Sequence, residues 1–150
     1  MFLVDTNVLV HAADSESPFH DRCFDSLDRW RHRSAAWFLT WPIVYEFLRV
    51  TTHPRVLRQP WNVTAGWRFV ESLLASPGLT VLAATERHAA VAAVTVSEMP
   101  HLAGNLIHDL HTAVLMREHG VRLIYTRDSD FHRFKFLQVV DPVAGEPTGE

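Results

Sequence analysis

Short apolar runs alternate with helical patterns of apolar and polar residues along the chain. Five runs have the apolar character of parallel strands that are buried on both faces. They cover residues 2–4, 37–39, 79–82, 123–125 and 137–140. Between them, apolar positions recur at helical spacing over residues 8–13, 18–30, 43–51, 64–74, 86–97 and 106–119. This alternation predicts a single α/β domain in which helices cover both faces of a five-stranded parallel sheet.

Capping residues mark several of the expected helix ends. Ser17 followed by Pro18 has the pattern of an N-cap and a first helical residue, and Asn105 is placed to cap the last helix. Gly120 follows that helix, which predicts a left-handed stop. The chain becomes rich in Pro, Gly and Glu near its end, so we expect a domain over residues 1–142 and a loose tail over 143–150.

Length and composition exclude several classes of protein. A chain of 150 residues suits one domain. Cys23 is the single cysteine, which excludes internal disulfides and Cys-rich zinc sites and fits a reducing compartment. The first residues lack the pattern of a signal peptide, and the longest apolar stretch, 89–96, is far too short to span a membrane. We therefore expect a cytoplasmic protein without a membrane partner.

Two acidic residues directly follow apolar strands. Asp5 comes after the first strand and Asp128 comes shortly after the fourth. Ligands of open α/β sheets bind at the carboxyl ends of strands, so these positions are candidates for a functional site. Taken singly, each Asp is equally well explained as a helix cap or a turn former.

Two further acids fall on helical patterns at positions that we expect to face the core. Asp109 lies in the stripe of Leu106 and Ala113, and Glu46 lies beside Phe47 on an expected buried side. Burying a carboxylate costs several kcal/mol unless a cation or a hydrogen-bonding partner compensates it. A buried Arg or His partner for each acid is the alternative to a shared site.

Four carboxylates in one site require cations, because each pair about 4 Å apart repels by about 4 kcal/mol at an effective dielectric constant near 20. Oxygen ligands select hard ions, so Mg²⁺ or Mn²⁺ is expected. Such a site activates water for attack on a phosphodiester. Thr6, Asn7 and Thr126 flank the acids and are placed to orient the carboxylates or the water.

The four acidic segments together resemble the motifs of PIN-domain ribonucleases, and the chain length resembles the VapC toxins within that family. The segments are Leu3–Leu9, Tyr45–Leu48, His108–Ala113 and Thr126–Phe131. The resemblance spans nearly the whole chain and implies a metal-dependent endoribonuclease that forms a homodimer and is neutralised by a small antitoxin. By position it implies metal ligands at Asp5, Asp109 and Asp128, a fourth catalytic acid at Glu46, and an auxiliary acid at Asp130.

Departures from the family pattern leave other functions open. His108 and His111 flank Asp109, where small or apolar residues are more usual, and Lys135 stands where many relatives carry Pro. The two histidines could also form part of a zinc site, although no third-ligand pattern accompanies them. An aspartyl phosphatase would need an acid at position 7, which is Asn. A catalytically silent PIN-like module that docks a protein is the remaining alternative.

Charge and aromatic residues suggest where RNA would bind. The formal net charge is −3, which gives no bulk attraction for nucleic acid, but four of the 17 acidic residues belong to the candidate site. The segment 29–58 holds six arginines against Glu46 alone, and we expect it to lie beside the site as a basic surface. RNA contacts are expected from Arg49, Arg127, His132 and Arg133. Trp41 is the tryptophan best placed to stack on a base, although most tryptophans are core residues.

Overall fold

A computed structural model describes residues 1–144 of the chain. Its single sheet has five parallel strands in the order β3-β2-β1-β4-β5. The strands are β1 (Phe2–Val4), β2 (Trp37–Thr40), β3 (Leu79–Leu82), β4 (Leu123–Tyr125) and β5 (Gln138–Val140). The predicted number, order along the chain and parallel direction of the strands are confirmed.

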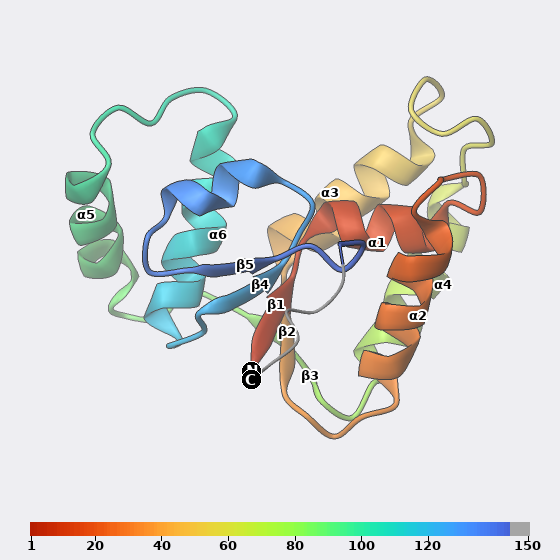
Figure 1. Cartoon of the computed structure of the whole chain (residues 1–150), viewed down its shortest axis with the longest axis horizontal. Helices are drawn as coiled ribbons and strands as arrows, with labels where there is room; N and C mark the ends of the chain where they lie inside the picture. Colours follow the sequence, from red (N-terminus) through yellow and green to blue (C-terminus); the bar gives the residue numbers. More distant parts are fainter. Residues whose placement is uncertain (145–150) are drawn as a thin grey trace.

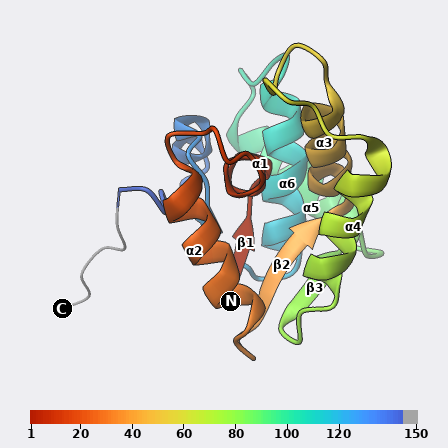
Figure 2. The same cartoon turned by 90° about the vertical axis from the view of Figure 1, so that its right-hand side faces the viewer.

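Helices cover both faces of this sheet. They are α1 (Thr6–Ala13), α2 (His20–Arg31), α3 (Trp41–Thr52), α4 (Val63–Leu74), α5 (His88–Glu98), α6 (Leu106–Glu118) and the 3₁₀ helix η1 (Ser129–Arg133). Figure 1 shows α5 and α6 on one side of the sheet and α1, α2 and α4 on the other, and Figure 2 shows α2 and α4 flanking β1 and β2 from the turned view. The chain steps from β1 out to β3 and then returns to β4, so it changes faces at the β1–β4 pair.

The centre of the sheet is fully buried. Leu3 and Val4 of β1 and Ile124 of β4 have no exposed surface, and Trp37 and Phe47 complete the contact of the sheet with α3. Cys23 is buried in the same core, as expected for a small apolar residue. Side chains on both faces of the central strands are therefore apolar, as parallel strands between two helical layers require.

Capping residues define three helix ends, and the predicted stop at Gly120 is one of them. Asn62 accepts a hydrogen bond from the Ala65 N–H at the start of α4. Gly120 ends α6 with a φ of 69°, a left-handed conformation that glycine adopts without steric cost. His53 is extended and ends α3 before Pro54.

One predicted cap is wrong, and another is confirmed in position only. Ser17 does not begin a helix, because its Oγ instead accepts from the Phe19 N–H in a turn, and α2 starts only at His20. Asn105 occupies the predicted N-cap position of α6, but it has helical backbone angles and its side chain makes no capping hydrogen bond.

The end of the described chain lies against the domain. Val143 is partly buried against the core, and its N–H donates to Asp141. Most of the predicted tail, residues 145–150, lies outside the described residues. Within residues 1–144, no helix is both long and apolar enough to cross a membrane.

Candidate active site

The change of faces at β1 and β4 brings two acidic strand ends together. Asp5 directly follows β1, and its N–H donates to the Tyr125 carbonyl at the end of β4. Asp128 follows β4 by three residues and caps η1. Neighbouring strands whose connections leave to opposite faces form a crevice at their carboxyl ends, which is where this fold type places its ligands.

Asp5 is held in one orientation by donors on both of its oxygens. Oδ1 accepts from the Thr6 N–H at 2.7 Å, which makes Asp5 the N-cap of α1. Oδ2 accepts from Asn7 Nδ2 and from Thr126 Oγ1, each at 2.7 Å. Asp5 is thus a helix cap, as the simpler interpretation held, and also a fixed carboxylate at the crevice.

Asn7 and Thr126 tie the two strand ends to each other. The Asn7 Oδ1 accepts from the Arg127 N–H at 3.0 Å, and the Thr126 Oγ1 accepts from the Asp128 N–H at 2.9 Å. Two side chains that the sequence placed beside the acids therefore set the position of the loop that carries Asp128.

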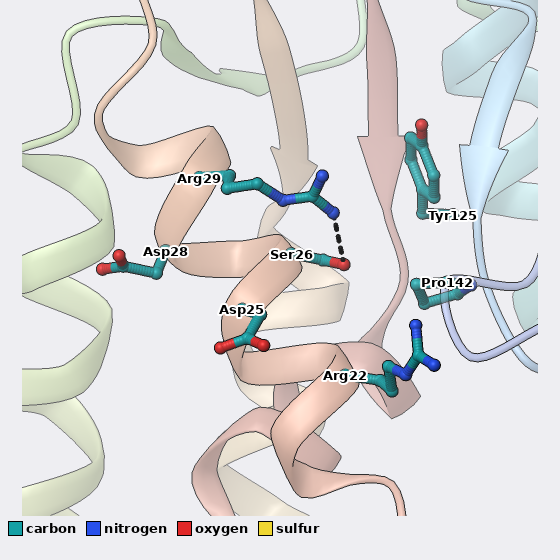
Figure 3. Close-up of a pocket in the computed structure, with 7 residues that line it drawn as sticks. All are labelled: Arg22, Asp25, Ser26, Asp28, Arg29, Tyr125 and Pro142. Atoms are coloured by element: carbon teal, nitrogen blue, oxygen red, sulfur yellow. Dashed lines mark hydrogen bonds between the residues drawn. The ribbon is translucent and has the colours of Figure 1, made fainter. Parts of the chain in front are cut away.

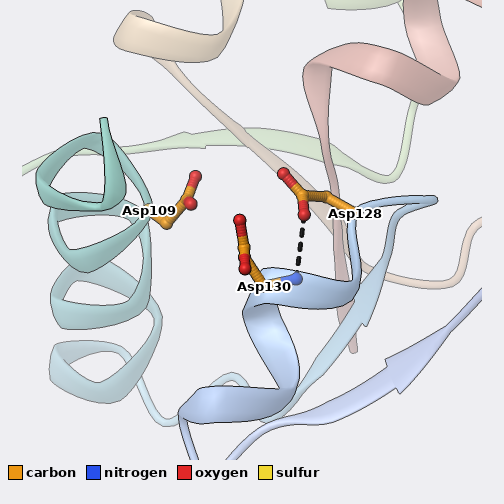
Figure 4. Close-up of side chains that lie close together, drawn as sticks. All are labelled: Asp109, Asp128 and Asp130. Carbon is orange, nitrogen blue, oxygen red and sulfur yellow. Dashed lines mark hydrogen bonds between the residues drawn. The ribbon is translucent and has the colours of Figure 1, made fainter. Parts of the chain in front are cut away.

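Three carboxylates gather on the other side of the crevice (Figure 4). Asp109 comes from the first turns of α6, while Asp128 and Asp130 come from the loop and first turn of η1. Each offers an oxygen, and these oxygens lie within 4.8 Å of one another. Figure 4 shows the carboxylates of Asp109 and Asp130 turned toward each other across the gap between α6 and η1. Asp130, predicted as an auxiliary acid, is thus a member of this cluster of three carboxylates, whereas Asp5 lies in the crevice outside it.

The crevice raises the pKa of two of its acids. Burial raises the pKa of Asp109 to about 7, with added repulsion from Asp128, Asp5, Asp130 and Glu46. Burial also raises the pKa of Asp5 to about 6 despite its hydrogen bonds to Thr126 and Thr6. Both shifts come mainly from burial of a carboxylate, and repulsion between neighbouring acids adds to them. A bound cation would offset both effects.

Glu46 reaches the site from the exposed side of α3, so the prediction that it projects from the buried side is wrong. Its side chain is 47% exposed and pairs with Arg49 at 3.1 Å. The buried face of α3 is made by Ile43, Val44 and Phe47 instead. The helical register places Glu46 beside this face rather than within it, and its charge keeps it in water.

These residues surround a hollow of about 890 Å³ at the carboxyl end of the sheet. An adjoining hollow of about 290 Å³ shares Asp5, Glu46, Asp109 and Asp128 with it. All four predicted catalytic acids therefore line one space. Several other lining residues were not predicted as site residues, namely Val10, His11, Pro42, Tyr45, Val50 and Asn105.

The arginines predicted to bind RNA have different surroundings. Arg49 lines the larger hollow, and Arg133 is exposed and pairs with Asp130. The guanidinium of Arg127 instead lies 3.5 Å from the centre of the Phe19 ring and pairs with Asp141. Arg127 is therefore engaged in holding the segment before α2 against the end of β5.

Residues 29–58, which were expected to lie beside the site as a basic surface, do so only in part, since Arg49 lines the acidic hollow and Arg29 does not. Arg29 lies near the end of α2, beside a separate hollow of about 550 Å³ that Arg22, Tyr125 and Pro142 also line (Figure 3). Since α2 leads into the start of β2, this end of the segment lies toward the amino edge of the sheet, whereas Arg49 lies at the carboxyl edge.

The zinc alternative finds no support in residues 1–144. His111 packs edge-on against the His88 ring, and the one described group of three metal-binding side chains consists of aspartates. The phosphatase alternative meets a different obstacle. The phosphatase mechanism needs an acid at position 7, and the Asn7 amide cannot serve as one. The Asn7 side chain instead donates to Asp5 and Thr126 and accepts from the Arg127 N–H.

Both the sequence and the fold of the chain are similar to those of known proteins. The family description "PIN domain" matches residues 2–137. Ribonuclease VapC48 of Mycobacterium tuberculosis is 32% identical over 141 residues, covering 94% of this chain and 97% of that protein. Among solved structures, the sarcin–ricin loop cleaving toxin VapC20 of Mycobacterium tuberculosis has a TM-score of 0.65 at 15% identity, over 91% of this chain and 97% of its own. The VapBC2 complex of Rickettsia felis with promoter DNA has a TM-score of 0.64 at 13% identity, over 93% and 96%.

Proposed function

The chain belongs to the PIN-domain family and, within it, to the VapC-type ribonucleases, and from this premise we propose that it is a divalent-cation-dependent endoribonuclease that hydrolyses RNA phosphodiester bonds. The observation that carries the proposal is the convergence of four acids from four distant segments on one hollow. Such a convergence has no structural purpose in the fold, because carboxylates that face one another destabilise it.

The donor set fits Mg²⁺ or Mn²⁺. Asp109, Asp128 and Asp130 offer only oxygens, and Asp5 faces the same hollow with an oriented carboxylate. Hard divalent ions prefer such ligands, and the burial and the neighbouring acids that raise the pKa of Asp109 are effects that a bound cation would offset. A cation bound there would polarise a phosphoryl oxygen and lower the pKa of a water molecule.

The protein's own side chains would orient the substrate and the water. The Thr6, Asn7 and Thr126 donors fix the Asp5 carboxylate, and Glu46 lines the same hollow. Arg49 sits on the rim, 64% exposed, where its guanidinium can meet a phosphate. His132 and Arg133 are exposed on η1, and we expect them to contact the RNA backbone.

The test is cleavage of total RNA by the purified chain with Mg²⁺ or Mn²⁺, with EDTA, and with Asp109→Asn. We expect cutting that requires the cation and falls by about a hundredfold or more in the variant, since the residue supplies a ligand of the cation. Glu98→Gln is the matched control, because Glu98 is an acid on α5 that pairs with Arg117 away from the hollow. Cutting in EDTA, or undiminished cutting by Asp109→Asn, would refute the proposal.

We further propose that the chain is the toxin of a toxin–antitoxin pair, acts as a homodimer and is neutralised by a small antitoxin. The support is its membership of the VapC-type family and its likeness in fold to the VapBC2 complex. Expression of the chain alone should arrest growth of the host, and coexpression of the neighbouring small reading frame should relieve the arrest. Light scattering should give twice the chain mass. Growth without arrest would favour a silent binding module.

A further inference from the structure

A separate hollow of about 550 Å³ lies between α2 and the ends of β4 and β5. Tyr125, the last residue of β4, and Pro142, shortly after β5, line one side of it, and α2 lines the other. This hollow shares no lining residue with the two hollows that hold the acids. The proposed cleavage chemistry therefore makes no use of it.

Three polar side chains of α2 line this hollow at helical spacing. Ser26 follows Arg22 by four residues and precedes Arg29 by three, which places all three on one side of the helix. Figure 3 shows both guanidinium groups turned toward the side of the hollow that Tyr125 and Pro142 line. Two permanently charged groups from one helix therefore face the same space.

The two arginines have no carboxylate partner within residues 1–144. Neither forms an ion pair there, and the one hydrogen bond of either guanidinium runs from Arg29 to the Ser26 hydroxyl at 3.2 Å. Asp25 and Asp28 also line the hollow, but Figure 3 shows their carboxylates turned away from the guanidinium groups. Asp28 pairs instead with His32 at 3.5 Å. The hollow thus offers donors and positive charge that suit an anion.

The helix that carries these donors is packed against a fixed aromatic cluster. Trp30 of α2 is 6% exposed, and its ring centre lies 4.6 Å from that of Tyr125, which in turn meets the Phe2 ring edge-on. Ser26 is 4% exposed and holds the Arg29 guanidinium in place. Apolar surroundings strengthen a hydrogen bond to an anion, and a side chain that is already ordered loses less entropy when the anion binds.

We propose that this hollow binds a phosphate monoester, with Arg22 and Arg29 donating to its oxygens and Ser26 orienting Arg29. The phosphate is carried either by a free mononucleotide or by the phosphorylated end of an RNA strand. The site does not require that the chain cuts RNA, so it goes beyond the proposed function. Guanidinium groups suit this ligand because each can donate two parallel hydrogen bonds to phosphate oxygens.

A phosphate monoester fits the hollow better than a carboxylate of an acidic peptide does. The monoester has a charge of about −1.5 to −2 at pH 7 and three terminal oxygens, so it can accept from two guanidinium groups at once. A carboxylate has only two oxygens, which a single bidentate arginine can engage. The volume of about 550 Å³ also falls in the range of sites for small molecules.

The test is a titration of the ¹⁵N-labelled full chain in EDTA, where no divalent cation attracts phosphate to the acidic hollow. Inorganic phosphate and adenosine monophosphate should shift the Nε–Hε resonances of Arg22 and Arg29 to saturation, and chloride at the same ionic strength should not. Arg22→Gln and Arg29→Gln should each weaken the affinity about tenfold or more, since each removes hydrogen bonds to a charged group. Arg68→Gln is the matched control, because Arg68 is exposed on α4 and lines none of the three hollows.

RNA strands in the same buffer distinguish the two carriers of the phosphate. If the carrier is RNA, a strand with a terminal phosphate should bind more tightly than the same strand with hydroxyl ends, and Arg22→Gln should remove the difference. If the carrier is a free mononucleotide, adenosine monophosphate should bind and the terminal phosphate should add nothing to the affinity of the strand.

Absence of saturation by both phosphate and adenosine monophosphate would overturn the site, and so would equal affinity of the parent and both glutamine variants. A tetraglutamate peptide that saturates the same resonances at lower concentration than phosphate would also overturn it, because the hollow would then be a protein contact. Failure of the ribonuclease proposal is distinct, since the titration contains no divalent cation and measures no cutting.

Discussion

At the scale of single residues, the Thr126 hydroxyl connects the two strand ends that carry Asp5 and Asp128. Its hydroxyl donates to Asp5 Oδ2 and accepts from the Asp128 N–H and from Asn7 Nδ2. It is 1% exposed, so no water replaces these bonds. One hydroxyl therefore fixes the acid that follows β1 relative to the acid that follows β4.

Thr126→Val should keep the shape of this side chain and remove the hydroxyl. We expect cation affinity and RNA cleavage to fall by about 10- to 100-fold, as is typical when a group that orients a metal ligand is lost. Titration with Mn²⁺ and cleavage assays measure the two effects. Thr126→Ser, which keeps the hydroxyl, should recover most of both, and equal loss in the two variants would contradict the argument.

At the scale of elements, α6 carries Asp109 and is held in place at its other end. Glu118, the last residue of α6, is 3% exposed. It accepts from the Thr85 N–H at 2.6 Å, from the Thr85 hydroxyl, and from His88 Nδ1 at 2.7 Å. Burial by itself would raise the pKa of Glu118, but the hydrogen bonds from Thr85 and His88 lower it to about 2. The charged carboxylate thus joins α6 to the start of α5.

Glu118→Ala should destabilise the protein by about 3 kcal/mol or more, because it leaves buried donors without a partner. The loss should be clear above about pH 4.5, where the carboxylate is charged in both the folded and unfolded states, and should shrink as pH falls toward 2. Urea unfolding measures it. Glu98→Ala, at the exposed end of α5, is the control and should have little effect.

The elements show what the sequence could predict. Apolar runs are sufficient to identify all five strands, because most positions of strands that are covered on both faces are apolar. The edge strands β3 and β5 include the exposed Thr80 and Gln138 but keep enough apolar residues to be recognised. Helix ends were less predictable. Ser17 and Asn105 are residue types that often cap helices, but neither side chain makes the capping hydrogen bond of a helix here. A cap depends on the backbone angles of one residue, which composition does not determine.

The candidate site was predicted at the level of its acids but not of their arrangement. Asp5 and Asp128 were found because they follow strands, and adjacency of β1 and β4 brings them together. The exposure of Glu46 follows from the apolar stripe of Ile43, Val44 and Phe47 on α3, which the prediction for Glu46 did not follow closely enough. The place of Asp130 beside Asp109 instead depends on how η1 packs, which no periodicity in the sequence encodes. The contacts of Arg127 with Phe19 and Asp141 likewise depend on how distant segments pack together.

At the scale of the whole molecule, the net charge of −3 says little about nucleic acid because the charge is concentrated in one place. Several of the acids that produce it face the hollow, where a divalent cation would reverse their local effect. The charge that an RNA strand meets near the crevice therefore depends on cation occupancy. The free energy of unfolding must also depend on cation occupancy, since repulsion between these acids opposes folding.

Without divalent cations, stability should fall as pH rises from about 4 to about 7. The pKa values of Asp109 and Asp5 are raised to about 7 and about 6, so over this range the folded chain binds more protons than the unfolded one. Burial lowers the pKa values of His11 and His111, which adds a contribution of opposite sign below about pH 6.5. The difference between the parent chain and Asp109→Asn isolates the aspartate contribution, and we expect the variant to lose less stability over the same range.

Mg²⁺ should replace the protons that these acids release, so its stabilising effect should be larger at about pH 7.5 than at about pH 5. At a concentration about 100 times the dissociation constant, binding contributes about 2.7 kcal/mol, or about 5 to 10 °C in Tm for a chain of this size. Thermal unfolding with Mg²⁺ or with EDTA at both pH values measures the effect. Asp109→Asn should show a much smaller shift at the higher pH, whereas Glu98→Gln should behave as the parent does. An equal Mg²⁺ shift in the parent and in Asp109→Asn would mean that the cation stabilises the fold from somewhere other than the acidic hollow.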